Sequence, residues 1–231
     1  MASDLAQEVA QQVIDRVHGI WLQNQNLYPA GYAVFFGPVW FRPKLMLIGL
    51  NPGGDESCFS GKKEVLVARE QPMEYITYRN DSTYPIAGRT ADIFESIGLM
   101  DLLSKSMKNN INFFRSKKWT ELPKQHASEC IKLLLSVIYK VEPWAILCES
   151  IGAFDILYRD LMKNHPHSLK TIKNDRNKRI YVSALREVCV SPQILIGITH
   201  LTGSYSRPLT TDKEQIKEKL KNDLHRTFQS T

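Results

Sequence analysis

No apolar run in this chain of 231 residues approaches the ~20 residues that a membrane-spanning helix needs. The longest such run near the amino terminus, residues 45–50, has the length of a β-strand. The first residues, MASDLAQEVAQQV, do not combine a basic segment with an apolar one, so they do not resemble a signal peptide. We therefore expect a cytoplasmic protein with no membrane partner.

Cysteine is scarce and badly spaced for metal binding. The four cysteines stand at positions 58, 130, 148 and 189, and no pair has the C-x-x-C spacing that is typical of zinc and iron–sulfur sites. Because disulfides are uncommon in proteins without an export signal, we expect buried free thiols. We also expect no metal and no other cofactor.

The usual phosphate-binding motifs are missing as well. The loop after the first predicted strand contains neither G-x-G-x-x-G nor G-K-[ST], which mark dinucleotide and P-loop sites. An unrelated nucleotide-binding enzyme of the α/β class is therefore the least favoured of the functions considered below. The sequence also has no internal repeat and no low-complexity segment.

The composition is that of a folded, basic domain. Hydrophobic residues make up 43% of the chain, and 30 Lys and Arg exceed 24 Asp and Glu, which gives a formal charge of +6. The length suits one α/β domain covering residues 1–231, which we expect to be a monomer. The excess of positive charge favours a polyanionic partner such as DNA.

Apolar periodicity predicts helices that alternate with buried strands. The expected helices cover residues 4–21, 90–98 (with Thr90 as N-cap and Gly98 at its end), 124–140, 152–162 and 211–228. Near-continuous apolar runs predict strands at 44–50, 144–148 and 193–199, with a short strand inside 105–118 and an edge strand at the end of the basic stretch 165–181. Residues 31–40 are expected to be irregular or to form an edge segment. This pattern predicts an α/β fold, a three-layer αβα sandwich with a short, mostly parallel central sheet.

Polar clusters follow three of the predicted strands. Asn51, Pro52 and Gly53 follow the first, the segment 109–115 (NNINFFR) contains the second cluster, and His200 follows the last strand. Ligands bind at the carboxyl ends of the strands in such sheets. We therefore expect the three clusters to meet at one site.

The residue types in these clusters suit a nucleobase. Pro52 fixes the turn after Asn51, so that its amide can point at a base or a water molecule. An asparagine at position 110 or 112 offers one acceptor and two donors, which match the O4 and N3–H edge of uracil or, after an amide flip, the N4 and N3 edge of cytosine. Taken singly, each cluster also has an ordinary interpretation as a turn, a solvated loop or a structural histidine.

The ordered set resembles the uracil-DNA glycosylase superfamily. The segment 49–53 (GLNPG) is similar to the G-x-N-P-G loop of that family, and 84–89 (YPIAGR) is similar to its P-F-x-G-R segment. Asn110, five residues before Arg115, is similar to the base-recognising asparagine of the S-N-x-x-x-x-R pattern, with Asn112 as the alternative. His200 stands at the position of the motif histidine. The resemblance covers about residues 44–210 and implies the fold of that family.

Three departures from the family leave the base itself open. The motif H-P-S-P is replaced here by residues 200–203 (HLTG), and Ile86 aligns with the phenylalanine that stacks on the flipped base, so Tyr84 or Phe59 would supply the stack. Asn51 stands where the G-Q-D-P branch has its catalytic aspartate. The resemblance therefore implies excision of either uracil or a bulky modified cytosine, as in foreign or phage DNA, which would give a role in DNA repair or antiviral defence.

The resemblance also implies a mechanism for a monofunctional DNA glycosylase. The target nucleotide is flipped out of the duplex, and Gly49 lets the chain approach the base. His200 donates a hydrogen bond to the pyrimidine O2 as negative charge develops there, and Asn51 positions the attacking water. Asp55 would add basicity if its loop turns inward, although a solvated Asp55 is the more ordinary interpretation.

The DNA backbone is expected to contact two basic runs and the loop after His200. In that loop, Tyr205 and Arg207 would fill the gap left by the base and grip phosphate. The first basic run comprises Lys105, Lys108, Arg115, Lys117 and Lys118, and the second comprises Lys170, Lys173, Arg176, Lys178 and Arg179. The alternative function is a non-catalytic DNA- or nucleotide-binding protein that keeps the fold.

Overall fold

The computed structural model describes residues 2–52, 65–67, 72–116, 123–187, 191–201 and 210–229. Within these residues, a central sheet has six strands in the order β4-β2-β5-β8-β7-β6. A second, two-stranded sheet pairs β1 (Tyr32–Val34) in parallel with β3 (Val65–Val67). The fold is therefore of the mixed α/β class, as predicted.

The central sheet is mostly parallel. Its strands β4 (Met107–Asn110), β2 (Leu45–Gly49), β5 (Ala145–Cys148) and β8 (Ile194–Ile198) all run in one direction. The hairpin of β6 (His167–Lys173) and β7 (Arg179–Arg186) continues the sheet, and β7 runs antiparallel to β8. The carboxyl ends of the four parallel strands therefore lie at one edge of the sheet, together with the β6–β7 turn.

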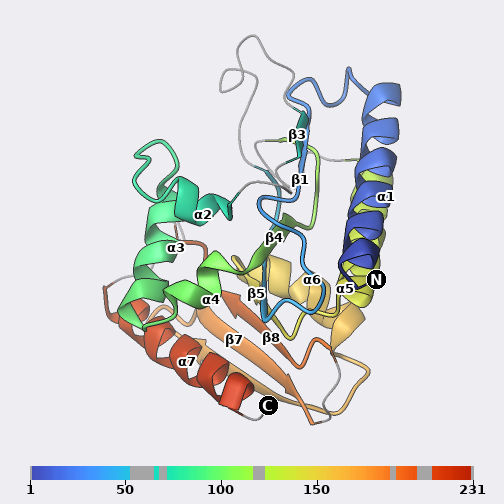
Figure 1. The fold of residues 1–231 in the computed structure, drawn as a ribbon. Coiled ribbons are helices and arrows are strands. Elements are labelled where there is room, and N and C mark those ends of the chain that lie inside the picture. Colours follow the sequence, from blue (N-terminus) through green and yellow to red (C-terminus); the bar gives the residue numbers. More distant parts are fainter. Residues whose placement is uncertain are drawn as a thin grey trace.

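Helices cover both faces of this sheet, an arrangement compatible with a three-layer sandwich (Figure 1). One face packs against α1 (Ala2–Gln23), α5 (Lys124–Val141) and α6 (Ile151–Leu161). The other packs against α2 (Glu74–Thr77), α3 (Pro85–Ser96), α4 (Met100–Ser104) and α7 (Thr210–Gln229). Strand alternation produces the two cores, since Met46 and Ile48 belong to the first and Leu45 and Leu47 to the second.

Two local predictions are wrong. Helix α3 begins at Pro85 and Thr90 is buried within it, because proline is favoured in the first turn, where its missing N–H is not needed. Gly98 does follow the helix end, with φ of 75°. A strand does begin at the end of the stretch 165–181, but this strand is β7 and lies inside the sheet, whereas the edge strand is β6, which precedes it. Strand β6 is exposed along most of its length, so its sequence lacks the apolar alternation of a half-buried strand.

Two further expectations concern thiols and membranes. Cys130 and Cys148 are buried free thiols, as predicted, whereas Cys58 and Cys189 lie outside the described residues. Among the residues that the structure describes, no helix is long and apolar enough to cross a membrane. The same residues contain no group of three or more His, Cys, Asp or Glu side chains that could hold a metal ion.

Candidate functional site

Three neighbouring strand ends place two polar side chains and a glycine side by side on one face of the sheet. Gly49 at the end of β2 is level with Asn110 at the end of β4. Glu149 follows β5 directly, and its backbone N–H donates to the carbonyl oxygen of Ile48 at 2.9 Å. Because residues in register share a face, Asn110, Gly49 and Glu149 all lie on the face that α3 covers.

Gly49 is required by the close approach of Asn110. A Cβ at position 49 would lie 2.1 Å from Oδ1 of Asn110 and 3.4 Å from Oε2 of Glu149. The Asn110 carboxamide therefore fills the space that any larger residue at position 49 would need. Asn110 is only 3% exposed. The structure thus brings together two of the predicted base-binding residues, Gly49 and Asn110, and adds Glu149 to them.

Glu149 belongs to a buried ion cluster, which comprises Lys108, Glu74, Glu149, Tyr75 and Tyr84. Nζ of Lys108 lies 2.6 Å from Oε1 of Glu74 and 3.4 Å from Oε2 of Glu149. The Tyr84 hydroxyl donates to Glu74 at 2.8 Å, and the Tyr75 hydroxyl donates to Glu149. The same ammonium lies 4.4 Å from the centre of the Tyr75 ring. This network fixes the Glu149 side chain on the sheet.

Electrostatics keep Lys108 protonated. Burial by itself lowers the pKa of Lys108, but the carboxylates of Glu149 and Glu74 outweigh burial, and the net direction is upward. The prediction that Lys108 contributes to a DNA-binding surface is therefore wrong, since this side chain is 4% exposed and paired with acids. The physical reason is strand alternation, which turns residue 108 towards the helices that cover the sheet.

His200 lies at the same edge, two residues beyond the end of β8. Its imidazole is partly buried, and burial lowers the pKa of His200 below its ordinary value, while the nearby Glu149 carboxylate acts in the opposite sense. The chain beside it is held by Arg89, whose Nη1 donates to the carbonyl oxygen of Leu201 at 2.6 Å. The imidazole is therefore predominantly neutral at pH 7, which suits a hydrogen-bond donor.

Within the segment 84–89, Gly88 allows a close backbone contact. A Cβ at Gly88 would lie 2.7 Å from the carbonyl oxygen of Arg79. Tyr84 is joined to the buried ion cluster, as described above, and its ring centre is 6.1 Å from that of Tyr75. Arg89, which ends the segment, holds Leu201. The residues of this motif thus connect α3 to the chain that follows β8.

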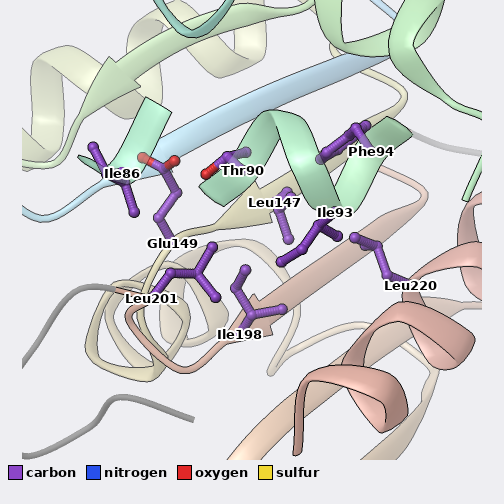
Figure 2. Close-up of a pocket in the computed structure, with 9 residues that line it drawn as sticks. All are labelled: Ile86, Thr90, Ile93, Phe94, Leu147, Glu149, Ile198, Leu201 and Leu220. Carbon is purple, nitrogen blue, oxygen red and sulfur yellow. The ribbon is translucent and has the colours of Figure 1, made fainter. Parts of the chain in front are cut away.

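A small, mostly apolar cavity lies between α3 and the sheet (Figure 2). Its lining residues include the predicted Ile86 and also Glu149. Asn51, Asn110 and His200 are not among its lining residues, which are Ile86, Thr90, Ile93, Phe94, Leu147, Glu149, Ile198, Leu201 and Leu220. Glu149 is thus a neighbour both of this cavity, whose exposed surface is apolar, and of the Asn110 side chain beside Gly49.

Asn51 and Asn112 use their side-chain amides to hold the backbone. Nδ2 of Asn51 donates to the carbonyl oxygen of Ser116 at 2.7 Å, which ties the end of β2 to the chain after β4. Asn112 donates to the carbonyl oxygen of Phe114 at 2.6 Å and accepts from the Phe114 N–H at 3.1 Å. Asn112 also contacts Cys130 of α5. Of the two asparagine candidates, only Asn110 lies beside Glu149.

The β6–β7 turn adds positive charge at the same edge. Tyr181 of β7 is paired with Ile198 of β8, and the N–H of Thr199 donates to the carbonyl oxygen of Ile180 at 2.9 Å. The turn just before this point therefore lies level with His200. We call the exposed cations at the end of β6 and in this turn the basic turn; they are Lys173, Arg176 and Lys178.

Other predicted residues have different outcomes. Arg115 is partly buried, and its backbone N–H donates to the carbonyl oxygen of Gly31 at 3.1 Å. Arg179 pairs with Asp155 at 2.5 Å. The remaining predicted site residues lie outside the described part of the chain; they are Asp55, Phe59, Lys117, Lys118, Tyr205 and Arg207.

The sequence predictions missed Glu149 and the residues that surround it. A signal for Glu149 was present, because it directly follows the predicted strand 144–148, which is the criterion that selected Asn51 and His200. No local pattern marked Glu74 or Tyr75 of α2. A scan of the chain against protein-family profiles finds no matching family, and a search of characterised proteins finds no match.

Proposed function

We propose that this protein is a DNA glycosylase with the fold of the uracil-DNA glycosylases, which flips out a damaged or modified pyrimidine and hydrolyses its N-glycosidic bond. The observation that carries the proposal is the row of Asn110, Gly49 and Glu149 at the carboxyl edge of the sheet, with His200 at the same edge. These are the strand ends at which open α/β sheets bind ligands. Asn110 would recognise the edge of the flipped base.

The chemistry follows from the charges that develop during hydrolysis. The base leaves with the electron pair of the glycosidic bond, water adds a hydroxyl group to C1′, and the proton of that water is released. His200, predominantly neutral at pH 7, would donate a hydrogen bond to the pyrimidine O2 as negative charge develops there. The bond from Asn51 to Ser116 fixes the rotation of the Asn51 amide, whose oxygen would hold the attacking water.

Lys108 supports the assignment as a monofunctional enzyme. A lyase step needs a neutral amine to attack C1′ of the sugar, but the neighbouring carboxylates keep Lys108 as a buried ammonium. Lys108 is therefore not a candidate for that step, and the proposed nucleophile is water. The basic turn lies at the same edge as His200 and would contact the phosphates that flank the flipped nucleotide.

The proposal is tested by measuring base release. Oligonucleotides containing uracil, hypoxanthine, cytosine or a 5-substituted cytosine are incubated with the protein, and abasic sites are revealed by alkaline cleavage. We expect release of at least one pyrimidine and a loss of roughly 10²- to 10³-fold in His200→Ala, the range for removal of one donor to a developing anion. A folded protein that releases no base from any substrate would overturn the proposal.

One observation favours the alternative of a non-catalytic binding protein. Asn51 has no carboxylate, and its amide nitrogen already donates a hydrogen bond to the backbone carbonyl oxygen of Ser116. This alternative predicts affinity for DNA without release of any base. The same substrate panel, combined with a DNA-binding measurement, distinguishes the two functions.

A further inference from the structure

His200 lies in a short stretch of chain that is anchored on both sides. Before it, the N–H of Thr199 donates to the carbonyl oxygen of Ile180 at 2.9 Å, which ties the chain to the neighbouring strand β7. After it, Nη1 of Arg89 donates to the carbonyl oxygen of Leu201 at 2.6 Å. The Leu201 side chain is 3% exposed and packs in the core beneath α3. The backbone at His200 is therefore held by the sheet on one side and by α3 on the other.

The chemistry of an arginine suits the contact from α3. A guanidinium is planar, stays charged at any pH at which the protein is folded, and presents several N–H donors. Its hydrogen bonds are stronger than those of a neutral donor. Arg89 lies in the first half of α3 and is partly buried, so one side chain both holds the Leu201 carbonyl oxygen and places a permanent positive charge near the imidazole of His200.

Several influences act on the protonation of His200. Burial is the largest and lowers the pKa of His200. The Glu149 carboxylate opposes burial, whereas the cations of Lys108 and Arg89 act in the same direction as burial. Because Lys108 is held in the buried ion cluster, Arg89 is the cation that can be removed while the paired charges of the core stay in place. Arg89 thus favours the neutral imidazole.

We propose that Arg89 is a positioning residue for His200, which it holds at the edge of the sheet by fixing the chain at Leu201 from α3. This inference rests on the proposed function, because it assigns to Arg89 the placement of the hydrogen-bond donor of that site. Arg89 acts through His200 and has no contact of its own with the reacting atoms.

The first test needs no substrate. The titration of His200 is followed by nuclear magnetic resonance in the intact protein, and the His200→Ala variant identifies its signal. We expect the pKa of His200 to rise in Arg89→Met, because a nearby cation is lost and the freed chain lets water reach the imidazole. In Arg89→Lys, which keeps the charge and a donor, it should stay close to the wild-type value. Arg79→Met is the matched control, because Arg79 pairs with Glu95 and Asp92 of the same helix.

The second test measures base release. We expect Arg89→Met to lower kcat by roughly 10²-fold, the cost of misplacing a positioned group by ~1 Å, with KM nearly unchanged and with partial recovery in Arg89→Lys. Since Arg89 acts through His200, Arg89→Met should cause little further loss in a protein that already carries His200→Ala.

The outcomes separate this inference from the proposed function. An unchanged pKa of His200 in a folded Arg89→Met variant, or an equal rise in Arg79→Met, would overturn the inference, and so would a full additional loss of kcat on top of His200→Ala. If Arg89→Met does not fold, Arg89→Gln, which removes the charge and keeps a polar side chain, is judged by the same criteria. The expected rise in a protein that releases no base from DNA would overturn the glycosylase activity and leave the placement of His200 by Arg89 standing.

Discussion

Replacing Gly49 with alanine should disable the site and leave the fold intact. The new Cβ would lie 2.1 Å from Oδ1 of Asn110, whereas real Cβ contacts essentially never fall below 3.0 Å. The carboxamide must therefore retreat by about 1 Å. Because Oδ1 is the far end of a flexible side chain, the backbone need not move. A misplacement of ~1 Å in a positioning group can cost about 10²-fold in rate, so we expect a loss of that order in base release.

Stability should change little in the same variant. Alanine in a strand is favoured over glycine by ~0.5–1 kcal/mol of backbone entropy, which offsets part of the strain from moving Asn110. We therefore expect a Tm within ~4 °C of the wild type, the shift for about 1 kcal/mol in a chain of this size. Calorimetry and the base-release assay, run on the same preparation, measure both quantities.

Two other glycines provide matched controls. A Cβ at Gly152 in α6 meets only ordinary contacts, the nearest at 3.8 Å, so Gly152→Ala should retain full activity. A Cβ at Gly197 would lie 2.5 Å from Cβ of Phe154, an atom that cannot move without its backbone, so Gly197→Ala should lower Tm. Wild-type activity in Gly49→Ala, or a loss explained entirely by a lower Tm as in Gly197→Ala, would refute the role given to Asn110.

Three further predictions test the electrostatics of this edge. Lys108→Met leaves two buried carboxylates without their cation, which should cost ~3–5 kcal/mol of stability. At ~2–4 °C per kcal/mol, we expect Tm to fall by roughly 10 °C. An unchanged Tm in a melting curve would contradict the ion pairing. The pKa of His200, followed by nuclear magnetic resonance, should lie below 6.5 and fall further in Glu149→Gln, because that carboxylate raises it; a rise would refute their proximity. Replacing both lysines of the basic turn with alanine should reduce the salt dependence of DNA binding by ~2 in log–log slope, and an equal reduction in the control Lys140→Ala/Lys163→Ala would show that the turn is not the contact.

The parallel core of the fold could be predicted because its strands are buried on both faces. Residues 45–49 and 194–198 are uninterrupted runs of apolar residues and glycine. This pattern can be recognised without knowing which strands pair with them. The hairpin of β6 and β7 could not be predicted as well, because β6 is an exposed edge strand rich in polar residues. Its place in the sheet comes from pairing with β7, which no local pattern in β6 records.

The candidate site was predictable only where it follows the strand ends. Asn110 and Gly49 were found in this way, and so could Glu149 have been. Lys108 could not, because in sequence it is one of several basic residues around a short strand. Its burial depends on Glu74, which lies in helix α2, and on Glu149, which follows strand β5. Whether a charged side chain is buried depends on the partners that the fold brings to it. The basic residues around Lys108 in the sequence therefore predict an exposed side chain, which is the opposite of what the structure shows.

The buried ion cluster also connects Glu149 to the hydrogen bond proposed for His200. One ammonium faces two carboxylates, so the cluster carries an excess negative charge beside the proposed base site. In the proposed reaction that charge would oppose the negative charge that a departing base acquires, and the hydrogen bond from His200 would have to offset it. His200→Ala should therefore cost more in the wild type than in Glu149→Gln, for whichever base the wild type releases. We expect a double-mutant cycle of kcat/KM to give a coupling of ~1 kcal/mol or more. Additive effects of the two substitutions would mean that Glu149 and His200 act on different parts of the reaction, and the single site described here would have to be divided.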